Sequence, residues 1–130
     1  MKACLDSWTV LAWLDGEEPS FGRVEELQAQ RPLLSWVNAV EVYYRTERDH
    51  GRQAADEVLA DLRVVMEIEL PGTGRMAEAA RLKTAHPIAL ADCFAIATAA
   101  AHAVTLLTGD PEITEREGLP CTVEDLRPAR

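Results

Sequence analysis

Short runs of apolar residues alternate along this chain with longer segments in which apolar residues recur every three or four positions. The short runs are almost unbroken in apolar character, which is typical of parallel strands buried on both faces. The longer segments have the period of amphipathic helices. The predicted strands are residues 1–5, 33–35, 64–68, 104–107 and 122–124. The predicted helices are residues 8–14, 20–29, 38–50, 53–62, 75–84 and 90–101, followed by a short helix after Asp110.

Strands that alternate with helices predict an α/β fold, in which helices cover both faces of a parallel sheet. The 130 residues contain no internal repeat, low-complexity tract or linker, so residues 1–130 are expected to form one domain. Ser20 and Asn38 are predicted to cap the starts of two helices, and Gly51 to end the second of them. Ligands bind such sheets beyond the carboxyl ends of the strands, so polar residues that follow strands are candidates for a functional site.

Composition and charge restrict the function further. Apolar residues make up 48% of the chain, which excludes a disordered tail. The 22 acidic residues outnumber the 13 basic ones, and the net charge of -9 argues against a protein that coats duplex nucleic acid. It does not exclude a nuclease, because a local cleft can differ from the whole surface. The three cysteines have no short spacing, which favours reduced thiols in a cytoplasmic protein over disulfides or a zinc site.

One segment, residues 88–107, has the length of a membrane span and a single charged residue, Asp92. Alanine dominates it, and both Asp92 and His102 would be costly in hydrocarbon. The segment is therefore predicted to be a buried helix followed by a buried strand, and no membrane partner is expected. A secretory signal is also not expected, because Asp6 interrupts the N-terminal apolar run.

Four carboxylates occupy positions where carboxylates are unusual. Asp6 and Asp110 directly follow predicted strands, and each alone could be an ordinary helix cap. Glu41 lies along the predicted inward face of its helix, which is formed by Val37, Val40 and Tyr44. Asp92 lies in the first turn of a helix that is apolar on nearly every side, where its alternative role is an internal cap on backbone amides.

Carboxylates gathered at the strand ends would repel one another and raise one another's pKa values. A hard divalent cation such as Mg²⁺ resolves that repulsion, because it prefers oxygen ligands. One or two such ions could activate water for hydrolysis of a phosphodiester. No cluster of His or Cys offers a competing site for a softer metal. The spacing of these residues therefore predicts an acidic metal site and leaves its substrate open.

Four segments carry a resemblance to a known family: LDSWTVLAWLDGE, NAVEVYYR, LADCFAIATA and LLTGDPEI. In this order they resemble the PIN-domain ribonucleases, and within them the VapC-type toxins of toxin–antitoxin pairs. The resemblance extends from Met1 to about Glu124. It implies a PIN-like three-layer sandwich with a central parallel sheet of about five short strands.

The resemblance also implies a metal-dependent endoribonuclease. Its catalytic and metal-binding residues would be Asp6, Glu41, Asp92 and Asp110, which would hold Mg²⁺ or Mn²⁺. Ser7 and Thr108 would support them by orienting a carboxylate or a water. Two positions depart from the family pattern. Ala89 replaces a usual Ser, and Trp8 replaces a usual polar residue and suggests packing there.

Further expectations concern partners. The family resemblance implies a homodimer, an RNA substrate and a cognate VapB-type antitoxin, whose basic side chains would suit an acidic groove. Arg45, Arg48 and Arg52 follow Glu41 at steps of three and four residues and could contact RNA phosphates. The alternative is that they pair with nearby acidic residues on a solvated helix face.

Two other classes of protein remain as alternatives. One is a PIN-like module that binds a partner without catalysis, which only an activity measurement separates from the enzyme. The other is a phosphoacceptor signalling domain of similar length, which would carry adjacent acids after its first strand and a lysine after its last. Here Asp6 stands alone after the first strand, and the lysines are Lys2 and Lys83.

Overall fold

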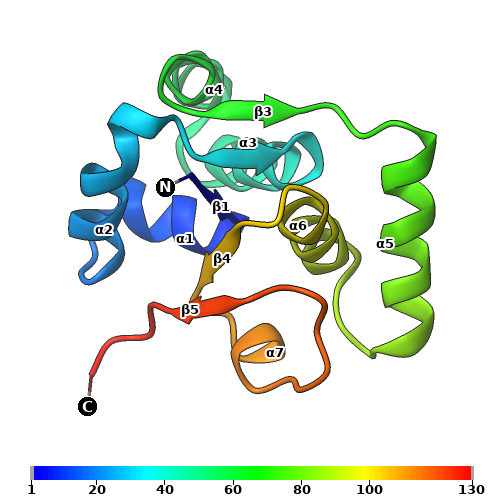
Figure 1. Cartoon of the computed structure of the whole chain (residues 1–130). Helices are drawn as coiled ribbons and strands as arrows, with labels where there is room; N and C mark the ends of the chain where they lie inside the picture. The colour runs from blue at the N-terminus through cyan, green and yellow to red at the C-terminus, as the bar shows by residue number, and fades with distance from the viewer. Residues whose placement is uncertain (1, 130) are drawn as a thin grey trace.

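A five-stranded parallel sheet runs through the centre of the computed structural model, which describes residues 2–129 (Figure 1). The strands lie in the order β3-β2-β1-β4-β5, and every neighbouring pair is parallel. Their bounds are β1 Ala3–Leu5, β2 Leu33–Ser35, β3 Glu67–Glu69, β4 Thr105–Thr108 and β5 Val123–Asp125. The predicted α/β fold with about five short strands is confirmed.

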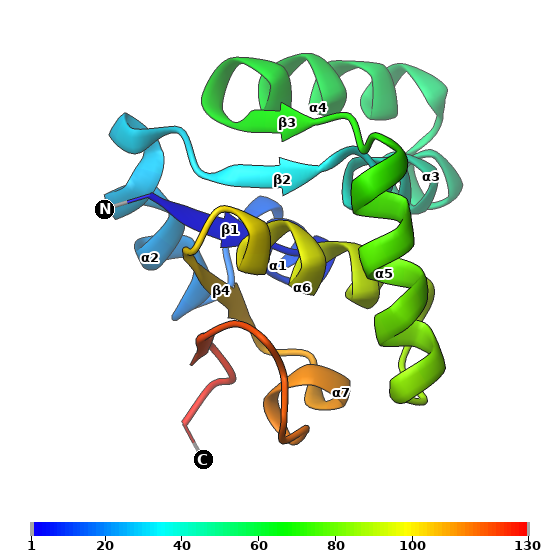
Figure 2. The same cartoon turned by 45° about the vertical axis from the view of Figure 1, so that its right-hand side comes forward.

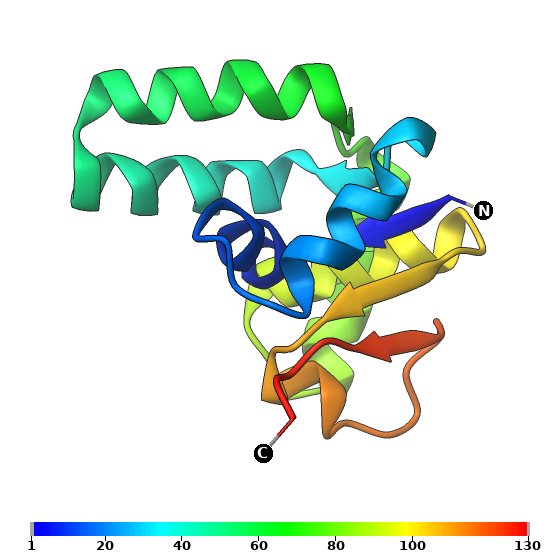
Figure 3. The same ribbon diagram turned by 90° about the vertical axis from the view of Figure 1, so that its left-hand side faces the viewer.

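Helices form the outer layers of the sandwich. Helices α1 and α2 lie on one side of the sheet, and α5 and α6 lie on the other (Figures 1 and 2). Helices α3 and α4 form an antiparallel pair that extends beyond the sheet (Figure 3). Their bounds are α1 Ser7–Leu14, α2 Ser20–Leu27, α3 Trp36–His50, α4 Arg52–Val65, α5 Thr73–Ala85, α6 Leu90–Ala101 and α7 Pro111–Thr114, with a 3-10 turn at Gln28–Gln30.

Successive residues of each strand point to opposite faces of the sheet, so both faces need apolar side chains. Leu5, Leu34 and Leu107 belong to the core cluster that includes helices α1 to α4. Cys4 and Leu106 belong to the second cluster, which α5 and α6 complete. Burial on both sides is the physical reason why the central strands β1, β2 and β4 are short and mostly apolar.

The strand order reverses between β1 and β4. The chain runs from β1 to β2 and β3 in one direction, and then continues with β4 and β5 on the other side of β1. Leu5 pairs in register with Leu107, so Asp6 and Thr108 follow at the same level. Such a reversal opens a crevice at the carboxyl ends of the two central strands.

Two predicted helix caps are wrong. Helix α3 begins at Trp36 and is capped by Ser35, whose Oγ accepts a hydrogen bond from Val37 N at 3.3 Å, so Asn38 lies inside the helix. Ser20 is the first residue of α2 rather than its cap. Its side chain is buried, so it does not lie outside the start of α2 as the side chain of a capping residue would.

The predicted inward face of α3 is also wrong. Val40 and Tyr44 are 59% and 50% exposed, whereas Asn38, Ala39, Val42 and Thr46 are buried. Buried Asn38 is satisfied in part, because its Nδ2 donates a hydrogen bond to the carbonyl oxygen of Ala91 at 3.2 Å while its Oδ1 has no partner. The helix is therefore rotated relative to the prediction, and Glu41 lies at the edge of the buried face.

The third strand lies further along the chain than predicted. Helix α4 continues through Val64, which is 74% exposed, and β3 begins only at Glu67. Residues 64 and 65 are β-branched, which favours a strand locally. The helix ends after Val65, and the backbone N–H of the buried Met66 that follows it donates to the carbonyl oxygen of Leu62.

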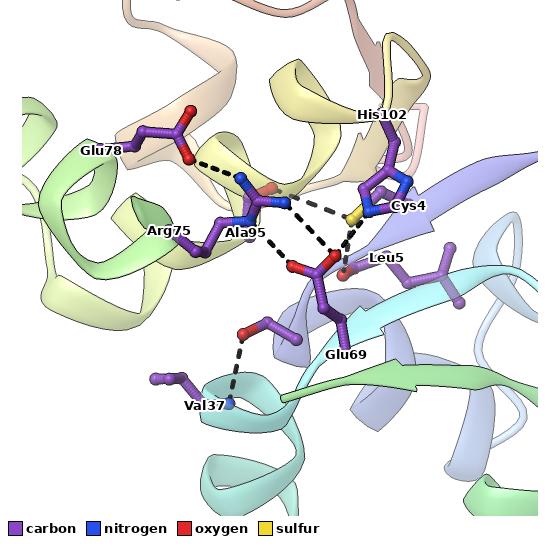
Figure 4. Close-up of polar contacts among 9 residues, drawn as sticks. Cys4, Leu5, Val37, Glu69, Arg75, Glu78, Ala95 and His102 are labelled. Carbon is purple, nitrogen blue, oxygen red and sulfur yellow. Dashed lines mark hydrogen bonds and ion pairs between the residues drawn. The ribbon is translucent and has the colours of Figure 1, made fainter. Parts of the chain in front are cut away.

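An ion-pair cluster ties α5 to the edge of the sheet (Figure 4). Arg75 Nε lies 2.8 Å from Glu69 Oε1 at the end of β3, and the same guanidinium pairs with Glu78. His102, which follows α6, contacts the other oxygen of Glu69. These contacts lower the pKa of Glu69, first through the hydrogen bond from Arg75 and also through His102.

Helix α6 is buried from Asp92 to Ala99, as predicted for a central helix. Within residues 2–129, no helix combines the length and the apolar character needed to cross a bilayer. Cys4, Cys93 and Cys121 are free, and the first two are buried. Burial raises the pKa of the Cys121 thiol to about 11.

Candidate metal centre

Asp6 anchors the site at the end of β1. It caps α1, because its Oδ1 accepts a hydrogen bond from Thr9 N at 2.9 Å, so the helix-cap role is confirmed. Its Oδ2 accepts a hydrogen bond from the Thr108 hydroxyl, and the side chain has no exposed surface. Burial raises the pKa of Asp6 to about 6, against the opposing effect of the hydrogen bonds from Thr108 and Thr9.

Thr108 connects the ends of the two central strands. Its buried hydroxyl donates to Asp6 and accepts a hydrogen bond from Asp110 N at 3.0 Å. Asp110 in turn caps α7, because its Oδ1 accepts from Glu112 N at 3.0 Å and Pro111 occupies the first helical position. One hydroxyl thus fixes the relative positions of two of the predicted acidic residues.

Asp92 reaches the same crevice from α6. Its side chain is 4% exposed, and its Oδ2 is buried without a hydrogen-bond partner. It does not act as the internal helix cap, because α6 is capped at Ala89 without a side-chain hydrogen bond. A buried carboxylate oxygen without a partner is costly unless another ligand or a proton satisfies it.

Asp92, Asp110 and Glu112 form a cluster of three carboxylates, which we call the acidic triad. One oxygen from each side chain lies within 4.8 Å of the others. The prediction missed Glu112. The sequence did contain a signal for it, because Glu112 lies two residues after Asp110, in the first turn of the helix that Asp110 caps. Glu112 Oε2 also accepts a hydrogen bond from the backbone N–H of Ala89 at 3.2 Å.

The triad is electrostatically strained as a group of bare anions. Burial raises the pKa of Asp92, and the contact with the Glu112 carboxyl and the charges of Asp110 and Asp6 raise it further. The same contact lowers the pKa of the exposed Glu112, and the two carboxyl groups titrate as a pair that shares a proton. A cation placed among these oxygens could take the place of that proton.

Glu41 and Ser7 lie on the α3 side of the crevice. Glu41 is half-buried, and its Oε1 accepts a hydrogen bond from the hydroxyl of Ser7, the residue after Asp6. The crevice thus brings Asp92 and Asp110 together and joins Asp6 to them through Thr108. Glu41 is outside the triad and is linked to Asp6 only through the neighbouring Ser7.

The donors of the triad fit a divalent metal. All three are carboxylates, without a His or Cys, which favours hard cations such as Mg²⁺ or Mn²⁺. The unpartnered Oδ2 of Asp92 provides a buried oxygen that lacks any other ligand. Exposed Glu112 gives the cluster an open side to solvent.

The arginines predicted to contact RNA lie further along α3. Arg48 is exposed and pairs with Asp49, Nε to Oδ1, at 2.9 Å. Arg45 lines a cavity of about 290 Å³ together with Leu11, Leu14 and His50. Contact between these arginines and RNA stays a prediction.

Thr108→Val should lower the affinity of the site for Mn²⁺ about 10-fold and destabilise the fold by about 2 kcal/mol. Valine has the same shape but leaves Asp6 Oδ2 and Asp110 N without their shared partner. Calorimetry of Mn²⁺ binding and thermal unfolding measure the two effects. Thr108→Ser, which keeps the hydroxyl, is the control and should retain most of both properties. Equal behaviour of the two variants would contradict the positioning role of the hydroxyl.

Comparison with known proteins gives one family and one group of structures. The family model described as PIN domain matches residues 3–119. The structure of VapBC2 from Rickettsia felis bound to a promoter DNA fragment matches with a TM-score of 0.77 and 17% identity, over 98% of this chain and 100% of that one. No curated protein matches the sequence at a significant level.

Two further solved structures have the same fold. The DNA-bound VapBC from Salmonella typhimurium has a TM-score of 0.76 and 16% identity, over 96% of this chain and 98% of that one. The Mycobacterium tuberculosis VapC20, described as a toxin that cleaves the sarcin-ricin loop, has a TM-score of 0.69 and 16% identity. It covers 89% of this chain and 95% of its own. At these identities the likeness shows a shared fold.

Proposed function

This chain belongs to the PIN domain family, whose model matches residues 3–119, and from that membership we propose that it is a metal-dependent endoribonuclease. The observation that carries the proposal is the acidic triad of Asp92, Asp110 and Glu112 at the switch point of the sheet. Within it, Oδ2 of Asp92 is buried without a hydrogen-bond donor from the described residues, and Asp92 contacts the Glu112 carboxyl, an arrangement that a cation would stabilise.

The residues of the triad would hold Mg²⁺ or Mn²⁺. Asp6 and Glu41 would add negative charge around the cation. When bound, the cation would supply a water of lowered pKa as nucleophile and would stabilise the leaving oxygen of a phosphodiester. Thr108 holds Asp6 and the backbone of Asp110 in place, and Ser7 holds Glu41, so the carboxylates need little rearrangement before reaction. Asp6 has no exposed surface, so its negative charge is unfavourable without a cation and would be stabilised by a metal ion held nearby.

The proposal extends to a biological setting. The VapBC structures described above are toxin–antitoxin assemblies, and VapC20 is described as an RNA-cleaving toxin. We infer that this chain is a VapC-type toxin that acts in the cytoplasm as a homodimer and is held inactive by a VapB-type antitoxin. The negative charge of the triad supports this partner, since an inserted arginine could pair with two carboxylates at once.

Cleavage of end-labelled RNAs by the isolated protein tests the activity. Discrete cuts in Mg²⁺ or Mn²⁺ that disappear in EDTA are the expected result, with transfer, ribosomal and messenger RNAs as substrates. Mn²⁺ binding is measured on the same protein by calorimetry. Folded protein that binds no metal and cuts no RNA would contradict the enzyme and favour a catalytically silent binding module.

A further inference from the structure

Trp8 lies against the backbone that carries the acidic triad. A methyl group added at Gly109 would lie 2.1 Å from Cη2 of the Trp8 ring and 2.4 Å from its Cζ3. Gly109 stands between Thr108 and Asp110, so the indole rests on the chain at the point where the site is held together. Only glycine permits this approach, because any other side chain would displace the ring.

The half-buried ring of Trp8 lines a groove next to the triad. Gly109, Pro111 and Pro128 line the same groove, whose volume is about 680 Å³. Gly109 and Pro111 flank Asp110 in the sequence, so the groove lies next to the triad. Its volume is within the range of sites that take small organic groups.

The charged residues that line the groove are already paired. Arg127 contacts Asp125 at 2.7 Å and Glu115, outside the lining, at 2.9 Å. The positive and negative lining groups therefore offset each other, and within residues 2–129 the lining offers no unpaired cation to a phosphate. An aromatic ring and two prolines form its remaining side-chain lining, which suits a flat, uncharged group.

We propose that this groove binds a base of the RNA substrate by stacking on Trp8, and so selects the nucleotide beside the cleaved phosphodiester. The proposal rests on the ribonuclease function proposed above and names a subsite of it. Continuity with the triad identifies the occupant, because a strand whose phosphodiester lies at Asp110 has its neighbouring base within reach of the groove. Stacking of bases on aromatic side chains is favourable for every base, and the groove walls add selection by size.

The other tryptophans do not share this position. Trp13 belongs to the same helix and, like Trp8, packs against the core, but its indole Nε1 is buried without a partner and it does not line the groove. Trp36 lines an apolar surface with Val40, Tyr43 and Leu59 on α3 and α4. Trp13→Leu is therefore a matched control for the loss of an indole from α1.

The test uses an RNA oligonucleotide that spans an observed cleavage site, together with versions lacking one base within three nucleotides of the cut. With the wild-type protein, removal of one particular base should lower kcat/KM about 10- to 100-fold. Trp8→Leu should lose a similar factor on intact RNA and should show no further loss when that base is removed. Trp13→Leu should keep the wild-type profile, and Trp8→Phe should keep part of the stacking.

A direct binding measurement accompanies the kinetics and does not depend on turnover. In the Trp13→Phe/Trp36→Phe variant, Trp8 is the only tryptophan, and its fluorescence should be quenched by intact RNA more than by the version lacking the selected base. Should Trp8→Leu fail to fold, Trp8→Phe and this fluorescence measurement decide the question.

Two results would overturn the proposal, and they differ from each other. If the wild type cleaves RNA, and removal of each base lowers kcat/KM by the same factor in the Trp8 variants as in the wild type, the groove serves packing or a protein partner instead. If the wild type cleaves no RNA, the ribonuclease function fails and the subsite fails with it.

Discussion

Asp92→Asn should lower kcat/KM for RNA cleavage by about 10³-fold or more, while the metal-free protein stays folded and becomes more stable. Asp92 is 4% exposed, and its Oδ2 has no hydrogen-bond partner. Burial and the neighbouring carboxylates raise its pKa, so its charged form is unfavourable in the absence of a cation. Asparagine is neutral and nearly isosteric, which removes the repulsion together with the metal ligand.

Steady-state cleavage, Mn²⁺ calorimetry and thermal unfolding of the metal-free protein measure the three consequences. Glu117→Gln is the control, since it also converts a carboxylate to an amide, at an exposed residue that follows α7 and lies outside the triad. It should leave all three properties unchanged. Asp92→Asn that still binds Mn²⁺ and cleaves RNA at the wild-type rate would remove Asp92 from the metal centre.

The fold was predictable because the central strands β1, β2 and β4 are short, mostly apolar runs with few local alternatives. Leu33–Ser35 was predicted with the bounds it has, since a strand buried on both faces cannot contain charged residues. The edge strand β3 has only half-buried and exposed residues, so its pattern is weak and its position was shifted. Parallel pairing among elements far apart in sequence then follows from the alternation of strands and helices.

The orientation of α3 could not be predicted from hydrophobicity. Its core face uses Ala39 and a hydrogen-bonded Asn38, whereas larger Val40 and Tyr44 lie on the surface. Such a face depends on how closely the neighbouring elements approach, which the sequence does not state locally. The residues predicted to form the inward face were therefore wrong, and Glu41 lies at the edge of the buried face rather than along it.

The candidate site was predictable only as far as residues that directly follow strands. Asp6 and Asp110 were found in this way, and Glu112 was missed because it follows a cap rather than a strand. The contact of Trp8 with Gly109 joins residues about a hundred positions apart, and only the pairing of β1 with β4 brings them together. The signal of this contact in the sequence was Trp8 itself, which stands where the family resemblance implied a polar residue. We expected Trp8 to pack at that position.

The stability of the metal-free protein should fall as the pH rises from 4.5 to 7. Burial raises the pKa of Asp6 from its ordinary value of 3.8 to about 6. In this interval the folded protein retains a proton that the unfolded chain has released, so the free energy of unfolding decreases with increasing pH, by about 2 kcal/mol from Asp6 alone. Asp92, whose pKa is also raised, acts in the same direction.

Carboxylates with lowered pKa values, such as Glu69 and Asp125, act in the opposite direction. They stabilise the fold above their unfolded pKa values, and that contribution is lost as the pH falls, mostly below 4.5. Urea unfolding in EDTA between pH 4.5 and 7 therefore isolates the groups whose pKa is raised. Asp6→Asn should flatten the profile by about 2 kcal/mol, because the amide does not titrate.

Added Mn²⁺ should stabilise the wild-type protein more at pH 7 than at pH 4.5, because a cation and protons compete for the same carboxylate oxygens. The metal-bound profile should therefore decline less than the metal-free one. Stability in EDTA that rises steadily up to pH 7 would mean that Asp6 and Asp92 are not destabilising as anions. The electrostatic strain that we assign to the triad would then be absent, and with it the reason for a cation at this site.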